Sequence, residues 1–189
     1  GLKIRVIDAR DYKEKIHDEK VLFLNGLHLP VASHSFYFEG GLLSLIKILN
    51  KSEKPIHDKV FYVEKENVEG GIAKIEISIQ YVEDIIIKEV SFANNIHTPE
   101  GGMHLTGFRT ALTRTLNDYA RKNNLIKEGE DNFTGDDVRE GLTAVVSVSL
   151  REPQFEGQTK AKLGNPEARG AVEAVFGETF SAYLEENPN

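Results

Sequence analysis

The sequence contains no cysteine, and this absence removes two kinds of site. Without thiols the chain can form neither a disulfide framework nor a thiolate metal site, so a reducing, cytoplasmic environment is the expectation. Long apolar runs are missing too, because every pure apolar stretch is far shorter than the ~20 residues that a membrane-spanning helix needs. The composition therefore excludes a disulfide-stapled secreted domain and favours an ordinary water-exposed fold.

A surplus of positive charge is also absent. Lysine and arginine together number 23 against 30 aspartates and glutamates, for a formal net charge of −7. The surface as a whole is therefore not a nucleic-acid footprint, and only a local basic face remains open. The 189 residues suit one domain or one domain with an appendage. Gly1 opens a strand-like alternation without a leader or initiator Met, so we expect a piece of a longer protein.

Two segments alternate apolar and polar residues with period two, at 74–81 and 142–150. This pattern predicts half-buried strands, with one face on a core and the other in water. Shorter apolar runs at 60–63 and 85–93 have the same character. Turn residues between them predict a three-stranded meander over 59–94.

Helical spacing of apolar residues predicts three helices between and after these strands. They are expected at about 104–122, at 41–49 and from Pro166 to the end, where Asn165 is well suited to cap the helix. A capping-box spacing predicts a fourth, short helix at 134–140. One amphipathic face per helix against a one-sided sheet gives an α+β fold.

The segment 153–165 is the most unusual part of the chain. It joins a predicted strand to a predicted helix, yet it is polar and rich in groups that can donate hydrogen bonds to an anion. These groups are Gln158, Thr159, Lys160 and Lys162. A polar loop between two rigid elements is a common place for function, and a plain surface connection explains it equally well.

Five cations cluster in sequence around the predicted long helix: Arg109, Arg114, Arg121, Lys122 and Arg139. Such charges are by default a solvated helix face. The alternative is a local track for DNA phosphates, which positions a duplex without reading its sequence.

Other motifs favour structural explanations. Glu-Gly-Gly occurs at 39–41, 69–71 and 100–102, but no Gly-Lys-Ser/Thr follows, so there is no P-loop. The six histidines are scattered without the spacing of a helical zinc site: His17, His28, His34, His57, His97 and His104. We therefore expect no metal, and the residues by themselves name no reaction.

Several runs, in the right order, resemble the transducer domain of the type IIA DNA topoisomerase family that comprises gyrase B and its topoisomerase IV counterpart. They are Phe36-Tyr37-Phe38-Glu39-Gly40-Gly41, Phe92-Ala93-Asn94-Asn95, the run Gly102 to Asn117 with its Gly-Phe-Arg, the run Gly135 to Val145, and Pro153 to Asn165 with its Gln158-Thr159-Lys160. The opening 1–8 is similar to the strand with which that domain begins. Together these matches cover about residues 36–188.

The resemblance implies a fold like the second domain of a small-subunit ribosomal protein. That fold has a sheet of four or more strands, helices packed on one face, and a left-handed β-α-β unit. It also implies one transducer domain over 1–189. In the family, an ATPase domain of the GHKL type precedes this domain and a TOPRIM domain follows it. The segment 11–35 is longer than the family pattern and is expected to be an insertion.

The resemblance further implies that the domain couples ATP binding and hydrolysis to DNA gate movement and strand passage. Lys160 is then the catalytic contact to the ATP γ-phosphate, with Gln158 and Thr159 beside it. A compact ammonium suits a phosphate whose charge grows during transfer. Arg109 and Arg114 are then expected to contact DNA.

ATP and Mg²⁺ are expected to be held mainly by the preceding domain, with DNA and a gyrase A-type subunit as partners. The chain alone should neither hydrolyse ATP nor cleave DNA. Gyrase and topoisomerase IV share the motifs, so the choice between supercoiling and decatenation stays open. The rival hypothesis is a non-enzymatic α+β binding module, which would not need the two flanking domains.

Overall fold

The computed structural model describes residues 3–8, 10, 32–37 and 39–188, which form two compact units, Gly1–Gly41 and Leu42–Asn189. In the first unit, strands β1 (Ile4–Ile7) and β2 (Ser33–Phe36) pair antiparallel. Most of the segment expected to be an insertion, residues 11–31, lies outside the described residues. Its last three residues, 33–35, belong to β2.

The second unit is built on a five-stranded sheet in the order β3-β4-β7-β5-β6. The strands are β3 (Phe61–Val68), β4 (Ile72–Tyr81), β5 (Lys88–Ala93), β6 (Ile96–His97) and β7 (Leu142–Leu150). Strand β7 lies between β4 and β5, antiparallel to the first and parallel to the second. The predicted meander over 59–94 is therefore wrong beyond the β3–β4 hairpin. Two parallel neighbours need a crossover, and here a long helix between β5 and β7 supplies it.

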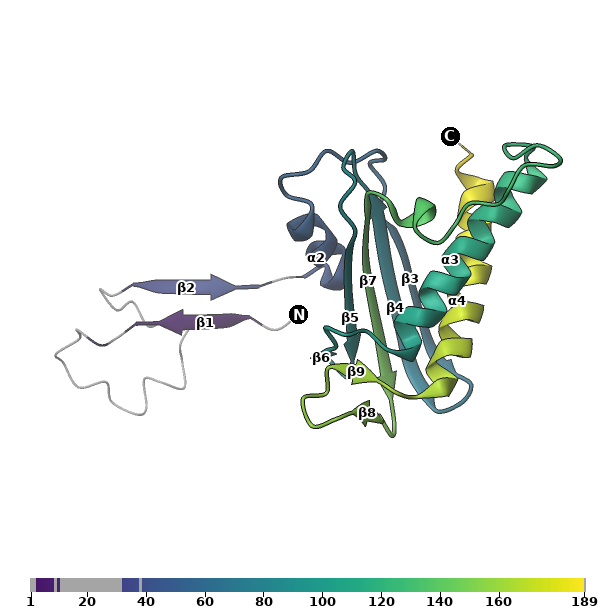
Figure 1. Ribbon diagram of the computed structural model, residues 1–189. Coiled ribbons are helices and arrows are strands. Elements are labelled where there is room, and N and C mark those ends of the chain that lie inside the picture. The colour runs from purple at the N-terminus through teal and green to yellow at the C-terminus, as the bar shows by residue number, and fades with distance from the viewer. Residues whose placement is uncertain (1–2, 9, 11–31, 38, 189) are drawn as a thin grey trace. The chain divides into compact units, whose positions relative to one another are not determined.

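Two long helices, α3 (Met103–Lys122) and α4 (Pro166–Glu186), lie side by side on one face of the sheet (Figure 1). They run in the same direction, because Gly107 meets the backbone of Arg169 near their beginnings and Lys122 pairs with Glu185 near their ends. Fully buried aromatic rings of Phe108 and Phe176 fill the layer between helices and sheet. Both helices thus begin at the same end of the sheet.

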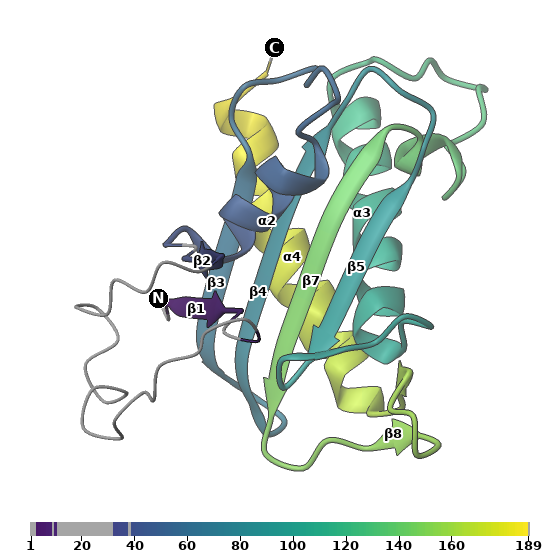
Figure 2. The same cartoon turned by 90° about the vertical axis from the view of Figure 1, so that its left-hand side faces the viewer.

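The shorter helix α2 (Gly41–Leu49) lies on the opposite face of the sheet (Figure 2). Its Ile46 is fully buried, and the side-chain amide of Asn50, which follows the helix, bonds to the side chains of Gln80 and Thr143. Strand β7 is consequently buried on both faces, not wet on one as predicted. The expectation of helices on one face holds for α3 and α4 only, within a mixed sheet that confirms the α+β class.

The remaining elements agree with the capping and turn signals. A reciprocal pair with capping-box spacing leads into the 3-10 turn η2 (Asp137–Arg139). The Thr134 N–H donates to the Asp137 carboxylate at 2.7 Å, and the Asp137 N–H donates to the Thr134 hydroxyl oxygen at 3.2 Å. The polar segment after β7 contains a small hairpin of β8 (Phe155–Glu156) and β9 (Lys162–Leu163). Among the described residues no helix is long and apolar enough to cross a bilayer.

Candidate functional site

The β8–β9 hairpin presents Gln158, Thr159 and Lys160 at its exposed tip. Lys160 has a φ of 54°, in the left-handed region, and its ammonium lies 5.8 Å from the centre of the Phe155 ring. Among the described residues no carboxylate pairs with this ammonium, whereas the neighbouring Lys162 is paired with Glu156 at 3.1 Å. The three residues expected to contact ATP are therefore together and open to a ligand.

The base of the hairpin is fixed to the segment that starts α3. The Glu100 N–H donates to the Ala161 carbonyl at 2.9 Å, and the Leu163 N–H donates to the Gly101 carbonyl at 3.0 Å. The next residue, Gly102, has a φ of 134°, and a Cβ there would lie 2.3 Å from the Leu163 carbonyl oxygen. Only glycine allows two backbones to approach so closely, which explains one of the Glu-Gly-Gly motifs structurally.

The other end of the hairpin is fixed by the side chain of Asn165, which is 1% exposed. Its Oδ1 accepts from the Gln154 N–H at 2.6 Å, and its Nδ2 donates to the Glu152 carbonyl at 3.1 Å and to the Glu167 carboxylate at 2.6 Å. The last bond lowers the pKa of Glu167. Asn165 does precede α4 as predicted, but its side chain makes no capping bond to that helix.

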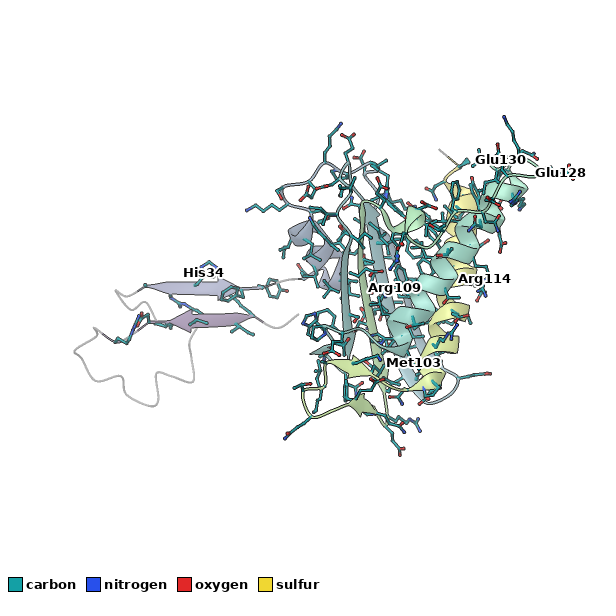
Figure 3. The ribbon with its side chains drawn as sticks, in the orientation of Figure 1. His34, Met103, Arg109, Arg114, Glu128 and Glu130 are labelled. Carbon is teal, nitrogen blue, oxygen red and sulfur yellow. The ribbon has the colours of Figure 1, made fainter. Side chains whose placement is uncertain are left out.

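A shallow groove of about 680 Å³ beside α3 collects three of the five clustered cations, Arg109, Arg114 and Arg139, together with Asp118. Both α3 arginines are visible in Figure 3. Arg109 is held in place by Glu89 of β5, whose two carboxylate oxygens accept from its Nε at 3.0 and 3.1 Å. This contact raises the pKa of Arg109, and the Glu89 side chain is only 8% exposed.

The other cations have different surroundings. Arg114 is 53% exposed and its Nη1 lies 3.9 Å from Glu173 of α4, a long contact. Arg121 instead bonds to Asn132 and the backbone after α3, and Lys122 pairs with Glu185 at 2.6 Å. The structure thus brings Arg109 and Arg114 to one groove and places Arg121 and Lys122 elsewhere.

One histidine at this end of the molecule is buried. His104, in the first turn of α3, has no exposed surface, and its Nε2 lies 3.4 Å from the Thr98 hydroxyl. Its Nδ1 has no hydrogen-bond partner among the described residues. Burial lowers the pKa of His104 to about 4, so the ring is neutral at pH 7. Within the described ranges, no group of three histidines or acidic residues could hold a metal ion.

The model of the DNA gyrase B family matches residues 41–189. This chain belongs to the DNA gyrase B family. It is 47% identical to the gyrase B protein of Bacillus mycoides over 189 residues, which is 100% of this chain and 42% of that protein. It is also 47% identical to the gyrase B protein of Clostridium acetobutylicum, covering 100% of this chain and 26% of that protein. The chain therefore spans less than half the length of these relatives.

Solved structures of the gyrase B family and of topoisomerase IV share the fold. The 43K ATPase domain of Thermus thermophilus gyrase B, in complex with an aminocoumarin, is 40% identical with a TM-score of 0.75, over 84% of this chain and 42% of that chain. The topoisomerase IV ATP-binding domain of Francisella tularensis is 26% identical with a TM-score of 0.66, over 84% of this chain and 41% of that chain.

The roles of two residues at these sites were not predicted from the sequence. Glu89 lies in a strand, where a glutamate usually indicates a solvent-exposed face. Its pairing with Arg109 depends on how α3 packs against β5. Asn165 before Pro166 is typical of a helix cap, so its bonds back to Glu152 and Gln154 had no local signal.

Proposed function

We propose that this chain is the transducer part of an ATP-dependent type IIA DNA topoisomerase, in which it couples ATP binding and hydrolysis to DNA gate movement and strand passage. Family membership supports the enzyme class. The observation that carries the finer assignment is the β8–β9 hairpin, whose tip offers Lys160 without an ionic partner in the described part of the chain. Its base is bonded to the segments that begin both long helices.

The tip suits the terminal phosphate of ATP. Phosphoryl transfer depends mainly on positioning and on neutralising charge, and a lysine supplies a compact point charge for this purpose. Gln158 and Thr159 add neutral donors next to Lys160, and all three side chains are exposed. In this proposal Lys160 is the catalytic contact, and the loss of the γ-phosphate on hydrolysis would release the hairpin.

The preceding GHKL domain is proposed to hold most of the nucleotide and its Mg²⁺, and the TOPRIM domain to follow this chain. A gyrase A-type subunit and DNA complete the set of partners, and the enzyme would act in the cytoplasm. We also assign the described sheet and helices to the left-handed β-α-β fold of the second domain of a small-subunit ribosomal protein. The parallel strands β5 and β7, joined through α3, are the connection that any β-α-β unit requires.

DNA contact is proposed for Arg109 and Arg114. Both line the groove beside α3, where at least half of the Arg114 side chain is exposed. Phosphate contacts of this kind position a duplex and are sequence-independent. The acidic surface elsewhere agrees with a local lining, since the whole chain carries a net charge of −7.

Lys160→Ala in the full-length protein tests the proposal. Loss of one charge contact to the transition state should slow ATP turnover by about 10²–10³-fold, with a smaller effect on nucleotide binding. Steady-state ATPase assays give kcat and KM for both proteins.

Lys162→Ala is the matched control, because it removes the same charge from the same hairpin at a lysine already paired with Glu156. It should leave turnover within about threefold, as expected for an exposed ion pair. Equal turnover of the Lys160→Ala variant and the unchanged protein would contradict the phosphate contact. The non-enzymatic binding module would then be the better hypothesis.

A further inference from the structure

We propose that Asn165 is a positioning residue for Lys160, acting by closing the neck of the β8–β9 hairpin. The inference rests on the proposed function, in which Lys160 contacts the nucleotide phosphate. Asn165 touches neither the tip nor any candidate ligand position. Its effect would come from where it holds the two strands that carry the tip.

The neck has two arms, and Asn165 connects them. The arm that leads into the hairpin contains Glu152 and Gln154, and the Asn165 amide bonds to the backbone of both. The arm that leads out passes through Gly164, whose N–H donates to the Gln154 carbonyl at 2.7 Å. The amide and this backbone bond together fix the spacing of the arms.

The contact requires an amide in particular. The Gln154 N–H needs an acceptor, while the Glu152 carbonyl and the Glu167 carboxylate need donors. Asparagine supplies one Oδ1 and two N–H groups, so a single buried side chain satisfies all three partners. Aspartate cannot donate at this position, and alanine leaves the Gln154 N–H without its partner. Loss of the acceptor for the Gln154 N–H, in a contact that is partly buried, favours opening of the neck.

The same side chain also ties the neck to a helix. Glu167 is in the first turn of α4, so its bond from Asn165 joins the hairpin to the start of that helix. The Leu163 bond to Gly101 joins the hairpin to the start of α3. A force on Lys160 would reach α3 through the Leu163 bond to Gly101. It would reach α4 through the chain itself, and the bond from Asn165 to Glu167 adds a side-chain connection to that helix.

The test compares Asn165→Ala with Asn50→Ala in the full-length protein. Asn50 is a matched control, because it is another buried asparagine with two side-chain hydrogen bonds, on the opposite face of the sheet. Asn165→Ala should lower kcat for ATP by roughly 10–100-fold, since a displacement of about 1 Å at a reacting group costs this much. KM should change little, and Asn50→Ala should keep kcat. Asn165→Ser keeps an oxygen acceptor and places no second carboxylate beside Glu167, so it should lower kcat less than Asn165→Ala and replaces it if the alanine variant does not fold.

Two further readouts separate positioning from general loss of structure. In the Lys160→Ala background, the Asn165→Ala change should lower kcat no further, because the ammonium that Asn165 positions is absent. Hydrogen exchange of the peptide 154–164 should rise in Asn165→Ala and not in Asn50→Ala.

The outcomes are distinct. An equal further loss of kcat in the Lys160→Ala background would overturn the positioning role, as would unchanged kcat in Asn165→Ala while Lys160→Ala is slow. If Lys160→Ala has no effect, the proposed function fails. Hydrogen exchange of the peptide 154–164 then decides by itself whether Asn165 closes the neck. Unchanged exchange in Asn165→Ala would overturn that role.

Discussion

The hairpin tip and the α3 groove both present cations to solvent, but they hold them differently. At the tip, the Lys160 ammonium lies 5.8 Å from the centre of the Phe155 ring and pairs with no carboxylate among the described residues. In the groove, Arg109 donates three hydrogen bonds to Glu89, a carboxylate that is almost fully buried. Within the described part of the chain, the tip therefore offers a charge without an ionic partner, and Arg109 in the groove is a charge already neutralised in part.

This difference decides how strongly each site indicates a ligand. A paired arginine at the edge of a sheet has a structural explanation, because it satisfies the charge of Glu89 whether or not DNA binds. Lys160 has no comparable partner in the described residues, and the fold uses a close backbone contact at Gly102 and three bonds of Asn165 to hold its hairpin. The inference of a ligand is therefore stronger at the tip, and four experiments can sharpen or break this contrast.

Gly102→Ala should have the largest effect on stability. The new Cβ would meet the Leu163 backbone at 2.3 Å, in a conformation with φ of 134° that essentially only glycine adopts. The free energy of unfolding should fall by about 3 kcal/mol, as overpacking and backbone strain add. Urea unfolding of the 189-residue chain measures it.

Gly71→Ala is the control for this variant. Gly71 also has a positive φ, of 80°, but a Cβ there meets nothing within 4 Å. Its cost should be about 1 kcal/mol, from the backbone alone. If both variants lose the same stability, the hairpin base is not held by close contact, and the contrast between tip and groove weakens.

The elements themselves were largely predictable. Helices α2, α3 and α4 follow from one apolar stripe each, and the β3–β4 hairpin follows from alternation around a turn. The partner of β5 was not predictable in this way, because period-two alternation does not say which strand lies beside it. The burial of β7 on both faces also depends on α2 packing against the second face of the sheet. One contact on that face joins Asn50 to Thr143, two residues that are 93 positions apart in sequence.

The candidate sites divide along the same line. The residues at the tip are contiguous, so a sequence motif can carry them, and the structure places all three together at an exposed turn. The groove and the neck are built from residues far apart, such as Glu89 with Arg109 and Asn165 with Glu152. Local patterns indicate a wet face or a helix cap for these residues, and only the packed structure gives them other partners.

Acidification should have the next largest effect, through the buried His104 in the first turn of α3. Its pKa is about 4 in the folded chain and about 6.5 when unfolded, so the unfolded chain binds the proton first as pH falls. Above pH 6.5 His104 is neutral in both states and costs the folded chain no stability. As the pH falls from 6.5 toward 4, the free energy of unfolding decreases progressively. At pH 5 the loss should be about 2 kcal/mol, measured by urea unfolding at pH 7.5 and pH 5.

His104→Gln separates this histidine from the other titrating groups. The variant should lose less stability than the unchanged chain between pH 7.5 and pH 5, by the same amount. Equal losses in the two proteins would mean that His104 takes up a proton in the folded state. The hairpin end would then have no acid-sensitive support at this residue.

DNA affinity should show the smallest effects. Arg114→Ala in the full-length protein should weaken duplex binding about two- to fivefold and reduce the slope of log affinity against log salt by about 0.9, as one phosphate contact is lost. Fluorescence anisotropy over a salt series measures both. Lys122→Ala removes the same charge from the same helix at a lysine paired with Glu185, outside the groove, and should leave the slope unchanged.

Arg109→Ala should differ from Arg114→Ala, because it also strips Glu89 of its main partner. Its free energy of unfolding should fall by about 1 kcal/mol, a value kept small because the Arg109 side chain is 44% exposed. Loss of stability without loss of DNA affinity would make Arg109 a purely structural arginine and leave Arg114 as the DNA contact in the groove. Loss of both stability and DNA affinity would mean that Glu89 orients Arg109 toward a DNA phosphate. A cation partly neutralised by a buried carboxylate could then still bind DNA.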